Sequence, residues 1–391
     1  MVIEVSKVSS RSELKTFMSA PAHLYRHFDE YFPPLELEMR KILDPRKAPF
    51  FKHGEAQFWL AHKDGQLVGR ISAQIDASQP HTAYGNAGLF GCLDVADDLE
   101  VTRALLQAAE GWLLEKGVER AVGPFMLNIN EMAGLLVDGH DLEPMIMVPW
   151  HPPYMARHFA GLPYRQCRDL HYWRLDWLQE KEARYSARPR LPRLPKDVRI
   201  RNLDFRSFDR DLEIVRSLYN SAWKENWGFV PLQPEDVEGL GTDLKPFLKE
   251  EMGVIVEKAG EPVAMAIIIP NISEITADIA PNPTLLGWLK LAYRTIFHKF
   301  QSGRIILFGI SPELRHSVGG AIVAMSMVEQ IIERLLKLNR QTGAIEAGWV
   351  LDNNQPLRNI LKQQGFKISR TLRLYERSLT LSGQKLIQDT H

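Results

Sequence analysis

The segment 305–321 combines residue types that could hold a phosphate group. An apolar strand is followed by the pair Gly319-Gly320, which opens an expected helix. A helix N-terminus presents free backbone N–H groups, and glycine lets the backbone approach an anion closely. Arg315 or His316 could add positive charge. We therefore expect an anion site at this loop and first helical turn, with an ordinary helix cap as the alternative; its residues are Arg315, His316, Ser317, Val318, Gly319, Gly320 and Ala321.

The elements that must position this loop occur twice along the chain. Three short patterns of the first half recur in the second half in the same order, at 64–71 and 259–266, at 88–92 and 306–310, and at 151–162 and 355–366. Each half carries an early hairpin followed by alternating strands and helices. We therefore predict a mixed α/β fold (α+β, with a mixed sheet) built from two similar domains. The changing offset between the repeats predicts insertions at about 126–145 and 272–303.

A polar, proline-containing stretch separates the two halves. Pro189, Pro192 and Pro195 follow one another at every third position within 179–197. Prolines at this spacing exclude an interior helix or a central strand. We expect an interdomain linker at 179–197 between domains at 1–178 and 198–391, either a solvated spacer or a contact to an anionic surface.

Composition excludes several classes of protein. The 391 residues contain 48 Lys and Arg and 48 Asp and Glu, so the net charge gives no general attraction to nucleic acid, and we expect no nucleic-acid partner. Two cysteines cannot build a disulfide framework, and the scattered histidines indicate neither a metal site nor a nucleophile. The charged N-terminus is unlike a signal peptide, and no apolar run is long enough to cross a bilayer. These features favour a cytoplasmic protein.

The second half resembles the GNAT superfamily of acyl-CoA-dependent N-acyltransferases over about 198–380. The stretch Pro312-Glu313-Leu314-Arg315 is similar to the end of the GNAT strand, although Arg315 lies four residues before Gly319, one more than usual. His316 restores the usual spacing to Gly319. A second similarity begins at Asn354, continues through Pro356 and ends at Gly365-Phe366, with Leu361 where many members keep a tyrosine general acid.

The first half resembles the same fold in a degenerate form. Asp97 and Asp98 stand where the phosphate loop would be, with no glycine, and would repel a pyrophosphate. We therefore expect CoA in the second half only. The whole chain is similar to a group of bacterial tandem GNAT proteins, one branch of which comprises bacterial ceramide synthases, at the segments 50–53, 68–71, 123–125, 128–137, 223–231 and 348–353.

The resemblance implies an acyl-CoA N-acyltransferase with acetyl-CoA or a long-chain acyl-CoA as co-substrate and no metal. Backbone amides near Gly309 and Ile310 would hold the acyl-CoA, with Asn354 in the second signature. Glu346 is our first candidate for the base, because its apolar neighbours would raise the pKa of its carboxyl; a salt-bridged strand glutamate is the alternative. Tyr375 could replace the missing tyrosine acid, or it could simply pack on the core.

Two groups of residues could contact the acceptor amine. Asn128, Asn130 and Glu131 follow Gly123-Pro124, where we expect the domains to meet, and could orient an amine or hydroxyl; turn formation is the alternative. Aromatic residues near the end of a helix could line an acceptor pocket or pack in the core, namely Trp223, Trp227 and Phe229.

The insertion at 285–300 reads as an apolar helix with basic residues at nearly helical spacing. It could be an interfacial helix at a membrane, a lid over an acyl chain, or a core-packed helix. We therefore expect a small-molecule or lipid amine as acceptor, with peripheral contact to the inner membrane face as an option and the oligomeric state left open. The alternatives are a short-chain acetyltransferase and a non-catalytic ligand-binding or regulatory protein. Aminoacyl-tRNA-dependent transfer is disfavoured by the zero net charge.

Overall fold

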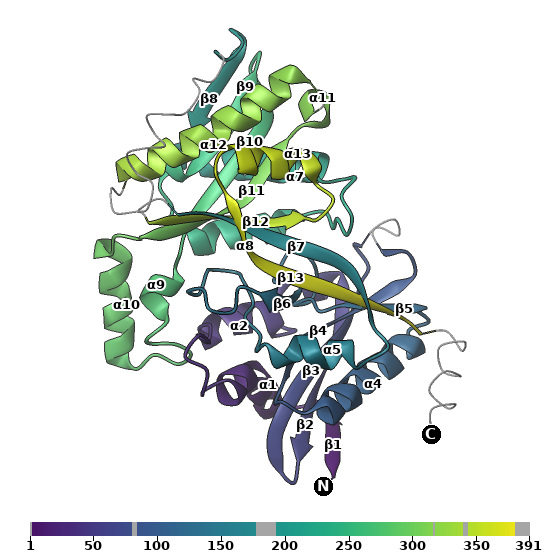
Figure 1. The fold of residues 1–391 in the computed structure, drawn as a ribbon. Helices are drawn as coiled ribbons and strands as arrows, with labels where there is room; N and C mark the ends of the chain where they lie inside the picture. Colours follow the sequence, from purple (N-terminus) through teal and green to yellow (C-terminus); the bar gives the residue numbers. More distant parts are fainter. Residues whose placement is uncertain (1, 80–83, 177–192, 316, 339–342, 380–391) are drawn as a thin grey trace.

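The computed structural model describes residues 2–79, 84–176, 193–315, 317–338 and 343–379. His316 and most of the linker expected at 179–197 lie outside the described residues. Within the described ranges, one large mixed sheet runs through both halves of the chain, with helices on its faces (Figure 1). The predicted mixed α/β fold is confirmed.

The strands follow one another across the sheet in the order β1-β2-β3-β4-β5-β13-β7-β12-β11-β10-β9-β8, with β6 paired to β13 beside this path. The first half contributes β1 (Ile3–Lys7), β2 (Gly54–Lys63), β3 (Gln66–Asp76), β4 (Ala87–Val95), β5 (Arg120–Gly123), β6 (Leu135–Asp138) and β7 (Arg165–Asp176). The second half contributes β8 (Val198–Asn202), β9 (Gly253–Lys258), β10 (Glu261–Pro270), β11 (Ser302–Ile310), β12 (Ala344–Leu351) and β13 (Lys367–Ser378).

The last strand of each half pairs within the sheet of the other half. Strand β13 lies between β5 and β7, with Tyr375 opposite Gly123. Strand β7 lies between β13 and β12, with Arg174 opposite Glu346. Figure 1 shows these two long strands crossing the middle of the molecule. Neither half therefore completes its own part of the sheet.

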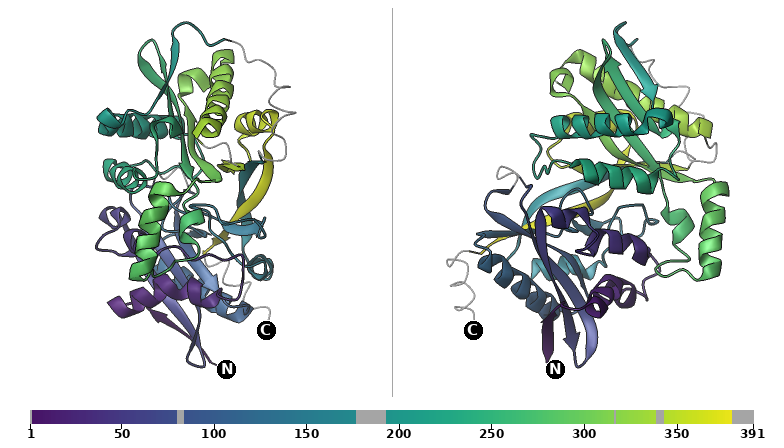
Figure 2. Two further views of the ribbon diagram at one scale, coloured as in Figure 1. Left: turned by 90° about the vertical axis from the view of Figure 1, so that its left-hand side faces the viewer. Right: turned by 180° about the vertical axis from the view of Figure 1, so that it is seen from behind.

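The helices cover both faces of the sheet in each half (Figure 2). The first half carries α1 (Arg11–Leu24), α2 (Glu36–Leu43), the 3-10 turn η1 (Pro49–Lys52), α4 (Leu99–Glu115) and α5 (Tyr154–Ala160). The second half carries the 3-10 turns η2 (Phe205–Ser207) and η3 (Glu250–Met252), together with α7 (Phe208–Ala222), α8 (Pro234–Leu244), α9 (Ser273–Thr276), α10 (Leu285–Phe297), α11 (Pro312–Arg315), α12 (Val318–Leu338) and α13 (Gln355–Gln363). The sequence analysis did not predict α2, and the structure adds it beside the interface.

Alternating side chains of the strands explain why helices pack on both faces. On β9 and β10, Val254 and Ala266 contact the apolar face of α12, whereas Ile255 and Met265 belong to the cluster with α7. This alternation is what the two-residue period of a strand requires. The helix that Gly319-Gly320 is expected to open, α12, is therefore packed in the core.

Both predicted insertions lie between the halves. The segment after Pro124 and the segment after Pro270 meet there, because Asn271 binds the main chain of Pro144 and Ile146. Asn271 is fully buried, so these bonds are protected from water. The insertions are therefore part of one interface.

We expect Gly91→Ala to destabilise the fold. A Cβ atom at Gly91 would lie 1.5 Å from the carbonyl oxygen of Phe125, a backbone atom that cannot rotate away. Overpacking of this kind should lower the free energy of unfolding by about 3 kcal/mol in urea denaturation. Gly111→Ala is the matched control: it meets nothing within 4 Å on α4 and should add about 0.5–1 kcal/mol. Equal stability of the two variants would contradict this packing.

Candidate functional site

Strands β11 and β12 stop pairing halfway along β11. The two are paired from Ser302, opposite Ala344, to Ile305, opposite Ala347. On its other side β11 stays paired with β10 as far as Ile310, with an irregularity in register opposite Ile268. Among the described strands, β11 therefore has no partner on the β12 side over 306–310. This unpaired edge, called the β11–β12 slot below, contains Gly309 and Ile310, where the resemblance to GNAT proteins implies amides for an acyl-CoA.

The N-terminus of α12 opens to solvent at the far end of this slot. Ser317 caps the helix, because its Oγ accepts from the N–H of Gly320 at 3.0 Å and donates to the carbonyl of Leu314 at 2.8 Å. Ser317 and Ala321 are exposed, and Val318 is 80% exposed. The positive end of the helix dipole is thus accessible to an anion.

Arg315 and Gly320 hold this loop in place through contacts within the protein. The Arg315 guanidinium donates to the carbonyl of Ala222 at the end of α7. A Cβ atom at Gly320 would lie 2.0 Å from the carbonyl oxygen of Leu314, so glycine is required there by packing. Gly319 has more room, since its nearest neighbour would be Ser317 Oγ at 3.6 Å. Of these residues, Gly319 is the best placed to face a ligand.

The second signature serves the fold. The side chain of Asn354 accepts from the N–H of Leu357 at 3.3 Å and so caps α13. Leu361, which replaces the family tyrosine, is 2% exposed and belongs to the core. These contacts explain how α13 is capped and packed. The role of Asn354 in holding acyl-CoA stays a prediction.

The corresponding slot of the first half is filled by the protein itself. Phe125 donates its N–H to the carbonyl of Phe90 at 2.8 Å, so the chain after β5 stays beside β4. At the end of β4, the N–H of Val95 donates to the hydroxyl of Tyr25 and its carbonyl accepts from the hydroxyl of Tyr154. In the first half, protein groups therefore bind the backbone N–H and C=O groups that have no β12 partner over 306–310 of the second half.

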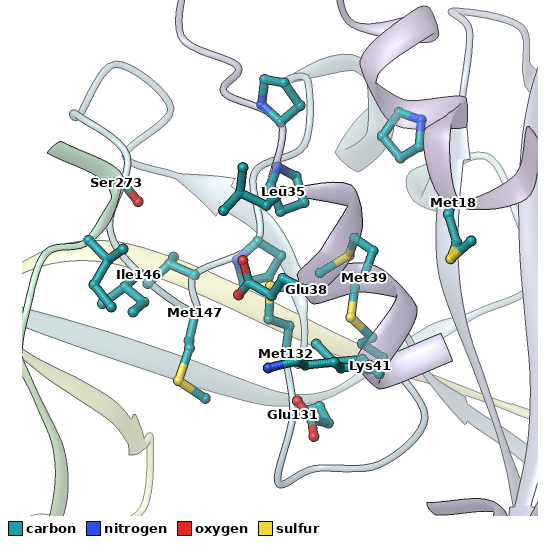
Figure 3. Close-up of a pocket in the computed structure, with 18 of the residues that line it drawn as sticks. Met18, Leu35, Glu38, Met39, Lys41, Glu131, Met132, Ile146, Met147 and Ser273 are labelled. Carbon is teal, nitrogen blue, oxygen red and sulfur yellow. The ribbon is translucent and has the colours of Figure 1, made fainter. Parts of the chain in front are cut away.

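A cavity of about 930 Å³ lies between the two halves, with apolar side chains along much of its wall (Figure 3). Both insertions contribute to it. Flexible methionines are frequent, which suits an adaptable apolar site; they are Met18, Met39, Met126, Met132, Met145 and Met147.

The charged side chains on this wall are mostly acidic, although the chain as a whole is neutral. Four are Lys or Arg, namely Lys41, Lys47, Arg70 and Arg370. Ten are carboxylates, namely Glu30, Glu36, Glu38, Asp94, Glu131, Glu143, Glu235, Asp236, Glu238 and Asp243. This excess favours a cationic ligand over an anionic one.

Glu131 has the most perturbed carboxyl of the cavity. Burial raises its pKa to about 7, and the charges of Asp236 and Glu38 act in the same direction. Burial also raises the pKa of both neighbours. Figure 3 shows Glu131 on the cavity wall. The Lys41 ammonium, on the same wall, is paired with Asp243 of α8. A carboxyl that titrates near neutral pH can accept a proton under physiological conditions.

A hydrogen-bonded chain connects this wall to the second half. Asp76 accepts from Nδ2 of Asn128 at 3.1 Å, and Oδ1 of Asn128 accepts from the N–H of Asn130 at 3.0 Å. Asn130 in turn donates to the carbonyl of Val230 and accepts from the hydroxyl of Tyr219 at 2.7 Å. The expectation that Asn128 and Asn130 lie where the halves meet is confirmed.

The sequence analysis missed a histidine on this wall. His53 lies 2.8 Å from Oδ1 of Asp76, measured from its Nδ1. In the tautomer in which Nδ1 donates to the carboxylate, Nε2 is a hydrogen-bond acceptor. The signal was present in the hairpin, because the register of β2 and β3 places Gly54 opposite Asp76. This register brings His53, the residue before Gly54, beside Asp76.

Arg304 connects the β11–β12 slot to the cavity wall. Its buried guanidinium donates to the carbonyl of Gly348 on β12, and to those of Ile146 and Met147 at 2.7 and 2.8 Å. Ile146 and Met147 line the cavity. The Arg304 side chain therefore connects the point where β11 and β12 separate to the wall of the cavity.

Glu346 and Tyr375 are both buried, in different places. Oε2 of Glu346 lies 2.6 Å from the Arg370 guanidinium, and the residue is fully buried. This pairing favours the salt-bridged glutamate considered above. Tyr375 stacks on Phe159 at 4.2 Å in the core of the first half, and burial raises the pKa of its hydroxyl. The packing alternative is favoured there, and both catalytic roles stay predictions.

The two predicted tryptophans do not line the cavity. Trp223 stacks on Tyr219 at 4.9 Å and covers Gly309, whose Cβ atom would lie 2.4 Å from the indole. Trp227 packs edge-on against Tyr84 at 4.9 Å. Phe229 packs against Tyr219. Of the six residues proposed for the acceptor, the structure thus brings only three to the cavity, which are Asn128, Asn130 and Glu131.

In the part of the chain that the structure describes, no group of three or more His, Cys, Asp or Glu side chains could hold a metal ion. No described helix has both the length and the apolar character needed to cross a bilayer.

The chain is similar to proteins of known sequence and structure over nearly its whole length. It is 34% identical to protein YghO of Escherichia coli (95% of this chain, 94% of that protein) and 33% identical to the bacterial ceramide synthase of Caulobacter vibrioides (96% and 98%). A solved tandem GNAT protein from the clavulanic acid biosynthesis pathway matches with a TM-score of 0.57 at 12% identity (97% and 99%). No family model matches the chain.

We expect Gly319→Glu to weaken CoA binding by about tenfold or more. A carboxylate at the N-terminus of α12 would neutralise the helix dipole and repel a pyrophosphate. Isothermal titration calorimetry measures the effect. Gly111→Glu, the same substitution on open helix surface, is the control and should leave the affinity unchanged. Unchanged affinity in Gly319→Glu would exclude this loop as the anion site.

Proposed function

The chain belongs to the tandem GNAT family that includes protein YghO and the bacterial ceramide synthase, and on this basis we propose that it transfers an acyl group from acyl-CoA to the amine of a long-chain lipid. The fold is that of GNAT N-acyltransferases. The observation that carries the proposal is the cavity of about 930 Å³ between the halves, which combines apolar walls with an excess of carboxylates. Such a cavity suits an amphiphile with a positive head.

The donor would occupy the second half. The unpaired edge of β11 offers backbone N–H and C=O groups to the pantetheine arm, and the exposed N-terminus of α12 suits the pyrophosphate. The closed slot of the first half supports a single donor site. The acyl-CoA would supply the activated thioester, and a backbone amide of the slot would stabilise the charge that develops on its carbonyl oxygen.

The acceptor would occupy the cavity. Its ammonium would be attracted by Glu131, Glu38 and Asp236, and its chain would lie among the methionines. Arg304 supports a short path between donor and acceptor, because it binds both β12 at Gly348 and the cavity wall at Met147.

We place the proton acceptor at Glu131. An ammonium must lose a proton before its nitrogen can attack the thioester, and a carboxyl with a pKa of about 7 can take that proton at neutral pH. Glu346 is less suited, since its Oε2 is paired with the Arg370 guanidinium and the side chain is fully buried. Glu131 would take one proton from the ammonium, and the nitrogen would then attack the thioester carbonyl to form the C–N bond. The C–S bond would break, and the second proton of the nitrogen would pass to the thiolate to give free CoA.

Titration of the purified protein with CoA, acetyl-CoA and palmitoyl-CoA should show affinity that increases with chain length. The reason is burial of the acyl chain in an apolar site. Isothermal titration calorimetry below the micelle concentration of palmitoyl-CoA is the measurement. Equal affinity for all three would support a short-chain acetyltransferase instead, and absence of binding would leave a non-catalytic protein on this fold.

Glu131→Gln should remove acyl transfer and stabilise the protein at the same time. Loss of the proton acceptor should lower kcat by about a hundredfold or more in a thioester-release assay. The folded-state pKa is raised from 4.5 to about 7, so the carboxyl destabilises the fold as the pH rises through this range, by about 3 kcal/mol at pH 8. The variant should therefore gain up to that amount at pH 8 and almost nothing below pH 4.5.

The control is Glu235→Gln on the same wall, where the Lys52 ammonium and a backbone bond lower the pKa of the carboxyl. It should gain no stability at pH 8 and keep its kcat. A Glu131→Gln variant with wild-type kcat would exclude Glu131 as the proton acceptor.

A further inference from the structure

Helix α10 presents its apolar side to water. Seven large apolar side chains of this 13-residue helix are exposed, and none of its residues is buried. At 100° per residue they form one continuous face over half of the helix circumference; they are Leu285, Leu286, Trp288, Leu289, Tyr293, Ile296 and Phe297. An ordinary surface helix has the opposite arrangement.

The charged groups of α10 pair with the segment that precedes the helix. Lys290 and Arg294 both bind Asp278, at 2.6 and 3.1 Å, and these cations lower the pKa of the Asp278 carboxyl. At the end of the helix, His298 lies 2.8 Å from Glu274. These ion pairs hold α10 against the segment that precedes it, and the apolar face of the helix is exposed to solvent.

The apolar face continues into the cavity. Trp288 and Leu291 of α10 are part of the cavity wall. Three further exposed apolar side chains on that wall extend this surface, namely Phe32, Leu37 and Leu240. Figures 1 and 2 show α10 at the edge of the molecule beside α9, away from the large sheet. A lipid chain could pass from α10 to the cavity without leaving apolar surroundings.

The chemistry of this surface favours a bilayer over a protein partner. Both charged side chains of the helix, Lys290 and Arg294, are basic, so anionic phospholipid is not repelled. The apolar face also leads directly to the cavity wall, and a lipid is the kind of molecule that can lie along both surfaces.

We propose that α10 is a membrane-docking helix, which lies flat in the surface of a phospholipid bilayer and places the mouth of the cavity against the lipid. Trp288 and Tyr293 suit the headgroup level. The nature of the molecule that then enters the cavity rests on the proposed function, whereas docking itself does not.

Binding to vesicles of phosphatidylcholine with a minor share of phosphatidylglycerol tests the proposal by co-sedimentation. Leu289→Glu/Ile296→Glu should weaken binding by about tenfold or more, because it places two charges in the apolar face. Both side chains are exposed, at 60% and 74%, so the unfolding midpoint should not fall. Val2→Glu/Leu114→Glu adds the same charge at exposed apolar positions elsewhere and should bind as the parent does.

Two results would overturn the proposal. One is a parent protein that does not bind vesicles. This includes a parent protein that dimerises through α10 instead, which sedimentation at several protein concentrations would reveal. The other is equal binding by the two double variants. Acyl transfer is measured separately: the α10 variant should keep the parent rate with detergent-dispersed acceptor and lose it with acceptor in vesicles. If no acyl transfer occurs under either condition, the proposed function is contradicted. Membrane docking is then decided by the vesicle co-sedimentation alone.

Discussion

The exchange of β7 and β13 between the halves is the constraint on which the rest of the structure depends. Each strand completes the sheet of the other half, so the hydrogen-bonded ladder runs unbroken from β1 to β8. Two domains joined only by a linker could rotate about it. Here such rotation would break central ladders, and the orientation of the halves is therefore fixed by backbone hydrogen bonds.

That fixed orientation lets a site form from parts far apart in the sequence. The insertions that follow Pro124 and Pro270 extend toward each other and enclose the cavity. Buried side chains then set its shape: Asn271 and Arg304 hold the Ile146 region, and Asn130 binds the second half. Because these contacts satisfy polar groups away from water, they position the wall with little freedom.

Much of the fold could be predicted from local patterns, and less of the site. Repeated motifs located both halves and both insertions, since each pattern reflects a local turn or strand. Strand exchange has no local signature, because β7 and β13 read as ordinary last strands. For the same reason the sequence left two readings of Glu346 open, and only the arrangement of β12 and β13 on either side of β7 brings Arg370 beside it. His53 needed the register of a hairpin, and Trp223 and Trp227 needed the packing around them.

The closed slot of the first half limits which parts of this protein can acquire a new ligand specificity by mutation. Reopening it would require the chain at Phe125, the hydroxyls of Tyr25 and Tyr154, and the aspartate cap of α4 to change together. Single mutations along that path would lower stability without restoring a function. Under the proposed function, donor specificity would therefore change only through the second half. Acceptor specificity could change through insertions from either half, so the acceptor is where this architecture allows the most variation.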